Sequence, residues 1–180
     1  ADLPELDLSD LEVDLAPNPR DVWCRNFGLL TVKDLFTGRQ LVALTTLSDL
    51  VGEAQERTQR DAESAGHSND LRGLVAGGLG QVAYANAVAV YCTLAVSKVA
   101  DYNSSLAVWS PSRDQAKSTF ARQALPMVWD YAEVNPFPNA AGDLQLTVAG
   151  MVRSLSRSVD GALGHASQED AVSQSLSKEK

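Results

Sequence analysis

The stretch at residues 81–105 constrains the fold more than any other part of the sequence. Apolar or small residues recur there at alternating steps of three and four positions: Ala85, Val88, Cys92, Ala95, Val99 and Tyr102. This spacing places them on one face of an α-helix. Most of the remaining positions are also small or apolar, and a helix that is apolar nearly all round is usually central in its fold. We therefore expect a central helix, in which Cys92 is a small core residue.

A second long helix is expected over residues 38–64. Thr37 and Gln40 fit a capping box, in which the two side chains satisfy free amide groups at the helix start. Leu44, Leu47, Val51 and Ala54 follow at helical spacing, and charged residues occupy the opposite face. Residues 66–70 and the glycine-rich residues 73–80 are expected to form the connection between the two helices. Gly78-Leu-Gly80 lacks the preceding strand and following partners of a phosphate-binding loop.

Further helical segments are expected over residues 112–124, 127–133 and 142–163, and no strand candidate is convincing. The fold class predicted is therefore all-α, a helical bundle-like domain of about four to six helices. Residues 1–20 contain Pro17 and Pro19 and are expected to form an extended acidic lead-in. Residues 21–165 would be a single helical domain. The serine-rich residues 166–180 would be a disordered tail.

The net charge of −8 is unevenly distributed along the chain. Residues 1–20 hold six acidic residues and one basic residue, whereas residues 71–139 hold four acidic and five basic residues. The middle of the chain is therefore not acidic, although it is no basic patch either. An uninterrupted apolar run of about 20 residues is absent, so no membrane span is expected. The acidic start does not resemble a signal peptide, which favours a cytoplasmic protein.

Metal and disulfide chemistry have little support in the sequence. Cys24 and Cys92 are far apart without CxxC spacing, and His67 and His165 are the only histidines. We expect two reduced thiols and no metal site.

Residues 101–137 concentrate aromatic side chains with interleaved polar ones. Flat rings can stack on an unpaired base, and Arg, Asn and Gln can form paired hydrogen bonds with base edges. The candidate DNA contacts are Arg122, Gln123, Trp129, Asn103 and Arg113, with Asp130 and Glu133 as residues that orient them. Equally, aromatic residues near helix ends can seal a core, and Arg with Asp can form an ion pair.

The string from Phe120 to Phe137, FARQALPMVWDYAEVNPF, closely resembles a signature of the large bacterial and archaeal adenine-specific DNA methylases. Members of that family begin with a conserved domain of unknown function and often include a zinc ribbon. The sequence DYNS at residues 101–104 and Trp109 match the lead-in to the signature. A second block, DLFTGRQLVALTT at residues 34–46, is similar to another family block, although Gly38 stands where proline is expected. Together the matches span roughly residues 27–137.

The resemblance implies a parent protein that uses S-adenosylmethionine to methylate adenine N6 in DNA. That chemistry needs a glycine-rich cofactor loop and an Asp-Pro-Pro-Tyr type of motif, and this chain has neither. Asn135-Pro136-Phe137 lacks the second proline of an Asn-Pro-Pro-Phe motif and is interpreted as a helix terminator. We therefore expect no catalytic residue and no cofactor in this chain.

The family order places this region between the cofactor motif and the Asp-Pro-Pro-Tyr motif. The chain would then be a fragment, an accessory or insertion domain that aids target DNA binding or covers the catalytic cleft. Its partners would be DNA, through the parent protein, and the catalytic domain of the same polypeptide. The alternative is a structural helical module that packs on the catalytic domain or forms a homodimer.

Overall fold

The computed structural model describes residues 6–137, 139 and 142–157. It is mostly helical, in agreement with the all-α class. The described residues form three α-helices, four 3₁₀ turns and one pair of very short strands. In chain order these are η1 (Ser9–Leu11), η2 (Trp23–Phe27), η3 (Val32–Leu35), α1 (Gly38–Ser64), η4 (Leu74–Ala76), α2 (Gln81–Tyr102), β1 (Trp109–Ser110), β2 (Gln115–Ala116) and α3 (Leu144–Leu155).

The start of α1 follows directly from its capping box. The Thr37 hydroxyl accepts a hydrogen bond from the Gln40 backbone N–H at 3.3 Å, and the Thr37 N–H donates to Gln40 Oε1 at 2.8 Å. Two of the amide groups at the helix start are thereby satisfied reciprocally. The expected bounds of α1 are confirmed at both ends.

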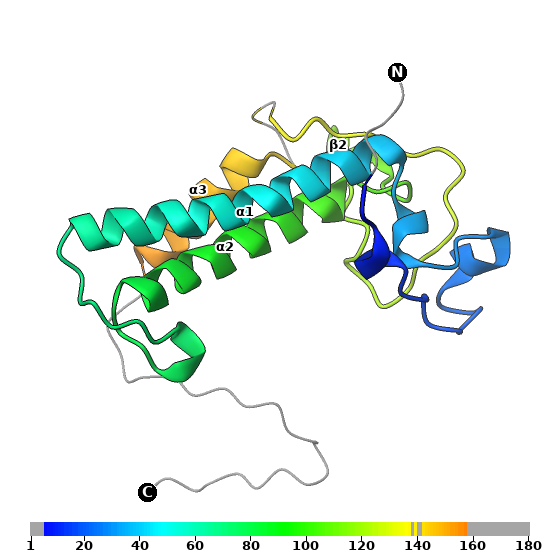
Figure 1. Cartoon of the computed structure of the whole chain (residues 1–180). Helices are drawn as coiled ribbons and strands as arrows, with labels where there is room; N and C mark the ends of the chain where they lie inside the picture. Colours follow the sequence, from blue (N-terminus) through cyan, green and yellow to red (C-terminus); the bar gives the residue numbers. More distant parts are fainter. Residues whose placement is uncertain (1–5, 138, 140–141, 158–180) are drawn as a thin grey trace, which may run out of the picture.

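The two long helices lie antiparallel and side by side, forming a hairpin that spans the molecule (Figure 1). Small residues of α2 contribute to the interior of the hairpin, since Ala85 and Ala95, which share one face of the helix, are both buried. Leu41 and Leu47 of α1 are buried as well. Small side chains allow two helices to approach closely, because interhelical distance depends on the side chains at the contact.

The expectation that α2 is central is only partly met. It contacts α1, α3 and η4, but Tyr84, Val90, Tyr91 and Leu94 are exposed. By length and composition, α2 is also apolar enough to cross a membrane. Of its apolar 18-residue stretch, 28% is buried in the fold. Core helices of soluble proteins pass the same test. The sequence prediction of no membrane span considered only uninterrupted apolar runs. It missed the high average hydropathy of α2 because Lys98 and Asp101 interrupt the run.

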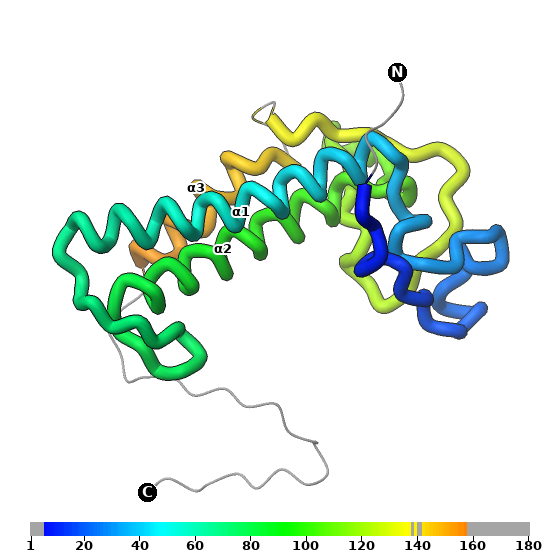
Figure 2. The backbone as a smooth tube through the Cα atoms, viewed as in Figure 1, coloured from blue at the N-terminus to red at the C-terminus, as the bar shows by residue number. Residues whose placement is uncertain are grey.

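The head of the molecule consists of residues 6–37 and 103–137, which flank the hairpin in sequence and meet at one of its ends. Figure 2 shows these two segments together where α1 begins and α2 ends. Their shared core contains Leu15, Val22, Cys24, Leu35 and Leu106. Backbone hydrogen bonds join the segments, including Leu125 N–H to Asp21 O at 2.7 Å and Ser105 N–H to Leu35 O at 2.8 Å.

The helices expected at residues 112–124 and 127–133 do not form. The first region instead turns back on itself through β1 and β2, with Trp109 paired to Ala116, and Asp114 adopts a left-handed φ of 50°. The second region is irregular, with a bend at residues 129–130, and its Ala132 N–H donates to Ala107 O at 2.7 Å. Both expectations were wrong because the backbone groups pair with other segments of the head rather than within a helix.

The lead-in at residues 1–20 is described only from residue 6. It is mostly exposed but contains η1, and Leu15 enters the core of the head. At the other end of the hairpin, residues 65–80 connect α1 to α2 as expected. Helix α3 begins where the Asp143 carboxylate accepts a hydrogen bond from Leu146 N–H at 3.0 Å, and it packs against α2. The helix ends at Leu155 with Ser156 as its C-cap, so the expected end near residue 163 was wrong. The expected tail at 166–180 lies outside the described residues.

Candidate functional site

Four of the five candidate DNA contacts lie on the surface of the head. Arg113, Arg122, Gln123 and Trp129 are all exposed. The two arginines form no ion pair within the part of the chain that the structure describes. Their guanidinium groups are therefore available to an external partner.

Asn103 differs from the other candidates because it is buried, at 6% exposure. Its Nδ2 donates to Val99 O at 3.0 Å, and its backbone N–H donates to the same carbonyl at 3.1 Å. These bonds satisfy a carbonyl at the C-terminal end of α2 that has no partner within the helix. Asn103 is a helix cap rather than a surface contact, which corrects the expectation from the sequence.

The expected orienting residues do not touch the candidate contacts. Glu133 forms an ion pair with Arg39 at the start of α1. It therefore connects residues 120–137, which we call the signature segment, to the hairpin. Asp130 is exposed and has no hydrogen bond or ion pair with another described residue. Neither carboxylate orients Arg122 or Gln123.

Trp129 belongs to an exposed aromatic cluster that the sequence did not reveal. Its ring meets the Phe27 ring edge-on at a centroid distance of 5.0 Å, and Phe27 lies 6.2 Å from Trp23. The three side chains, which we call the aromatic surface, are 77%, 45% and 54% exposed in the order Trp129, Phe27, Trp23. Such exposure is unusual for three adjacent large rings. Exposed apolar patches of this kind commonly mark contact sites.

The aromatic surface exists because two distant segments are paired. Val22 and Leu125 form a parallel β-bridge, and Cys24 N–H donates to Leu125 O at 3.2 Å. This pairing brings the chain after Leu125 alongside η2. The hydrophobic character of residues 23–36 was visible in the sequence, but nothing in it placed Trp23 and Phe27 beside Trp129.

The start of the signature segment is held by Asp101 at the end of α2. Its carboxylate accepts hydrogen bonds from Lys98 Nζ at 2.9 Å, from the Ser118 hydroxyl, and from Phe120 N–H at 2.8 Å. Burial by itself would raise the pKa of Asp101, but these donors together hold the pKa below its usual value. Asp101 is therefore an ionised anchor that fixes residues 118–120 against the helix.

A cavity of about 370 Å³ lies where α1 begins, α2 ends and the signature segment crosses them. Its polar lining comes from Arg39, Gln40, Asn103, Glu133 and Asn135. The capping box points Gln40 Oε1 at Thr37, and Gln40 Nε2 has no hydrogen-bond acceptor in the described structure. The size falls within the range of small-ligand pockets, so the cavity could hold a small molecule or ordered water with an acceptor for this amide.

Catalytic groups are not gathered in this region. Among residues 6–137, 139 and 142–157, no group of three or more His, Cys, Asp or Glu side chains could hold a metal ion. Cys24 is buried in the core of the head, where burial raises the pKa of its thiol. A protonated buried thiol is a poor nucleophile.

No protein-family model matches the chain, and searches of curated proteins and of solved structures found no similar protein. The resemblance to DNA methylases is therefore one of the two sequence blocks alone.

Proposed function

We propose that this chain is an accessory helical domain of an S-adenosylmethionine-dependent DNA adenine-N6 methyltransferase, in which it contacts an unpaired or extruded base of the target DNA. The catalytic motifs and the cofactor site would lie elsewhere in the parent protein. Support comes from the sequence blocks at residues 34–46 and 101–137 and from the surface that Trp129 forms with Phe27 and Trp23.

The aromatic surface is the observation that carries the proposal. Trp129 lies within the signature string, and Arg122 and Gln123 of the same string are exposed and available. A base stacked on an aromatic side chain contributes about 1–3 kcal/mol to binding. Guanidinium and amide groups add hydrogen bonds to base edges.

The charge of the head determines which form of DNA this surface suits. Residues 103–137 carry three basic and three acidic side chains, and the flanking lead-in is acidic. Duplex binding relies on neutralising phosphates, so this surface offers little to a fully paired duplex. Exposed rings favour bases that have left the stack, which predicts a preference for single-stranded or mismatched DNA.

The test is a fluorescence anisotropy titration of labelled single-stranded and duplex oligonucleotides at low salt. We expect weak binding with a preference for the single strand. Trp129→Ala should weaken it about 5- to 150-fold, the equivalent of 1–3 kcal/mol. Tyr91→Ala is the matched control, because Tyr91 is an exposed ring of α2 and belongs to neither segment of the head. Absence of binding at low salt, or equal losses in the two variants, would refute the proposal.

A second candidate function is a protein-interaction module, and the exposed faces of two helices favour it. Tyr84, Tyr91 and Leu94 of α2 and Val152 of α3 are exposed apolar side chains. Such faces would pack on the catalytic domain or on a second copy of the chain. Sedimentation of the wild type and of Leu94→Glu separates the two functions. An oligomer that Leu94→Glu dissociates, together with no DNA binding, would favour the interaction module.

A further inference from the structure

A second groove lies on the hairpin, with a lining that shares only Leu44 with the cavity described above and includes no residue of the aromatic surface. Its volume is about 650 Å³, and it runs between residues 6–11, the turn at η3 and the facing sides of α1 and α2. The floor is apolar, and three carboxylates of the N-terminal segment and α1 stand among its lining residues. The residues that matter here are Leu11, Phe36 and Val96 of the floor and Asp7, Asp10 and Asp49.

The charge of this groove is uncompensated. None of its lining residues is basic. Asp10 and Asp49 have no hydrogen bond or ion pair with another described residue, and Asp7 accepts only from Ser9, at 2.8 Å and 3.1 Å. Three exposed carboxylates beside an apolar floor are therefore free to pair with a cationic partner.

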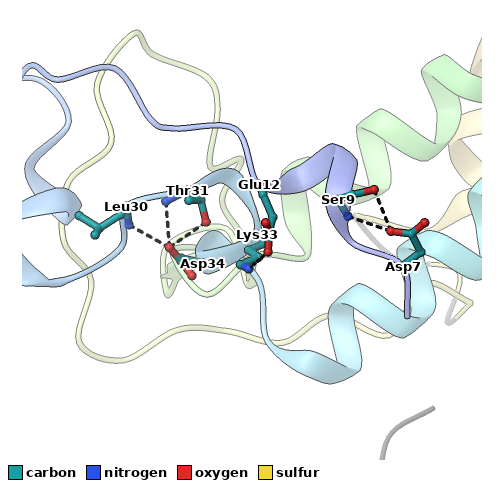
Figure 3. A network of polar contacts seen from close by, with 7 residues as sticks. All are labelled: Asp7, Ser9, Glu12, Leu30, Thr31, Lys33 and Asp34. Atoms are coloured by element: carbon teal, nitrogen blue, oxygen red, sulfur yellow. Dashed lines mark hydrogen bonds and ion pairs between the residues drawn. The ribbon is translucent and has the colours of Figure 1, made fainter. Parts of the chain in front are cut away.

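The neighbouring polar contacts keep this arrangement in place. Lys33 is the basic residue of η3, but it forms an ion pair with Glu12 (Figure 3). It is not among the residues that line the groove. Asp34 accepts hydrogen bonds from Leu30 N–H at 3.0 Å and Thr31 N–H at 2.8 Å, which fixes the turn beneath. The backbone N–H of Val32 donates to Val13 O at 2.9 Å and ties the segment bearing Asp7 and Asp10 to that turn.

We propose that the groove binds an amphipathic peptide segment that carries basic residues along one edge. Its apolar side chains fill the floor between α1 and α2, and its Lys or Arg side chains meet Asp7, Asp10 and Asp49. A groove between two helices receives the apolar face of a third helix in many peptide complexes, and unpaired acidic groups select a cationic partner over a neutral or acidic one. This inference does not depend on the proposed contact with DNA.

The probe is a fluorescein-labelled peptide of about 15 residues, with leucine at helical spacing on one face and lysine on the other. Two control peptides replace every lysine by glutamate or scramble the order so that the apolar face is lost. Anisotropy is measured at about 0.15 M ionic strength, where exposed charges farther apart than about 8 Å are largely screened. Only the amphipathic basic peptide should bind.

A matched pair of double variants separates the groove from the general charge of the protein. Asp10→Asn with Asp49→Asn removes two groove carboxylates. Glu63→Gln with Asp114→Asn removes the same charge from exposed positions that do not line the groove. We expect about a tenfold loss of affinity in the first double variant and less than about twofold in the second.

Amide chemical shifts place the bound peptide. On titration, the residues that move should be those of the groove, including Thr45, Ser48 and Thr93. Equal losses in the two double variants, binding of the scrambled peptide with unchanged affinity, or shifts confined to another face would each overturn the proposal.

Discussion

Replacing Asp101 by asparagine tests how the signature segment is held. The side chain of Asp101 is 14% exposed and accepts from three donors, two of which belong to residues 118–120. Asparagine has nearly the same shape but is neutral and has one acceptor oxygen instead of two. The substitution therefore removes the charge and one acceptor without creating a cavity.

The expected loss follows from the individual contacts. Lys98 is 46% exposed at its side chain, and an exposed i,i+3 pair of this kind contributes only about 0.3–0.5 kcal/mol. Hydrogen bonds to a charged group contribute about 1.5–3 kcal/mol each, and asparagine retains one of them in weaker, neutral form. We expect Asp101→Asn to lower the free energy of unfolding by about 2–4 kcal/mol at pH 7. For a chain of this size each kcal/mol lowers the melting temperature by about 2–4 °C.

The lowered pKa of Asp101 determines how the stability loss in Asp101→Asn depends on pH. The pKa of Asp101 is lowered in the folded protein, so its contribution is complete above the unfolded-state pKa of about 4 and declines as pH falls through the folded-state pKa. The difference between wild type and Asp101→Asn should therefore shrink below about pH 4. Chemical denaturation at pH 7 and pH 3 measures both values.

Asp61→Asn is the matched control for this substitution. Asp61 faces Arg57 at 3.8 Å on the exposed side of α1, where its side chain is 75% exposed. We expect its replacement to cost less than about 0.5 kcal/mol at any pH. A loss at Asp101 no larger than that at Asp61, or a loss that is unchanged at pH 3, would refute the anchoring role.

Three further stability predictions can be checked by chemical denaturation. Gly78→Ala should destabilise the fold by about 1–3 kcal/mol, because a Cβ there would lie 1.9 Å from Arg72 O, whereas Gly52→Ala has open space and should stabilise α1 by about 0.5–1 kcal/mol. A Gly78 variant as stable as wild type would contradict the close approach. Ala95→Leu should cost about 1–3 kcal/mol by overpacking a helix seam where Ala95 is 1% exposed; an unchanged midpoint would show that the seam has room. Thr37→Ala should cost about 1 kcal/mol through loss of the α1 cap, and a loss below about 0.3 kcal/mol would mean that water replaces it.

The two long helices could be predicted from the sequence because their signals are local. The capping box at Thr37 and Gln40 and the apolar periodicity of residues 81–102 each act within a few turns of one helix. The same holds for the start of α3, which Asp143 caps with its own side chain. Local signals also identified residues 101–137 as the segment richest in aromatic and polar groups.

The conformation of the head could not be predicted because its determining contacts are distant in sequence. Residues 112–133 are compatible with helix by composition, yet their backbone groups pair with Asp101, Ala107 and Asp21. Asn103 was expected to contact a ligand and instead caps α2. Glu133 was expected to orient its neighbours and instead pairs with Arg39, 94 positions away in sequence.

The sequence by itself therefore determined the helical hairpin, since helix starts and helical faces depend on side chains within a few residues of one another. Only the tertiary structure decided which surfaces are available for binding. Trp23 and Phe27 join Trp129 because a backbone bridge at Val22 and Leu125 closes a loop of about 100 residues. Asp10 and Asp49 likewise line one groove although they lie in segments that are distant in sequence. Closing such loops costs entropy that no local motif supplies, and burial of the shared core around Cys24 and Leu35 offsets that cost.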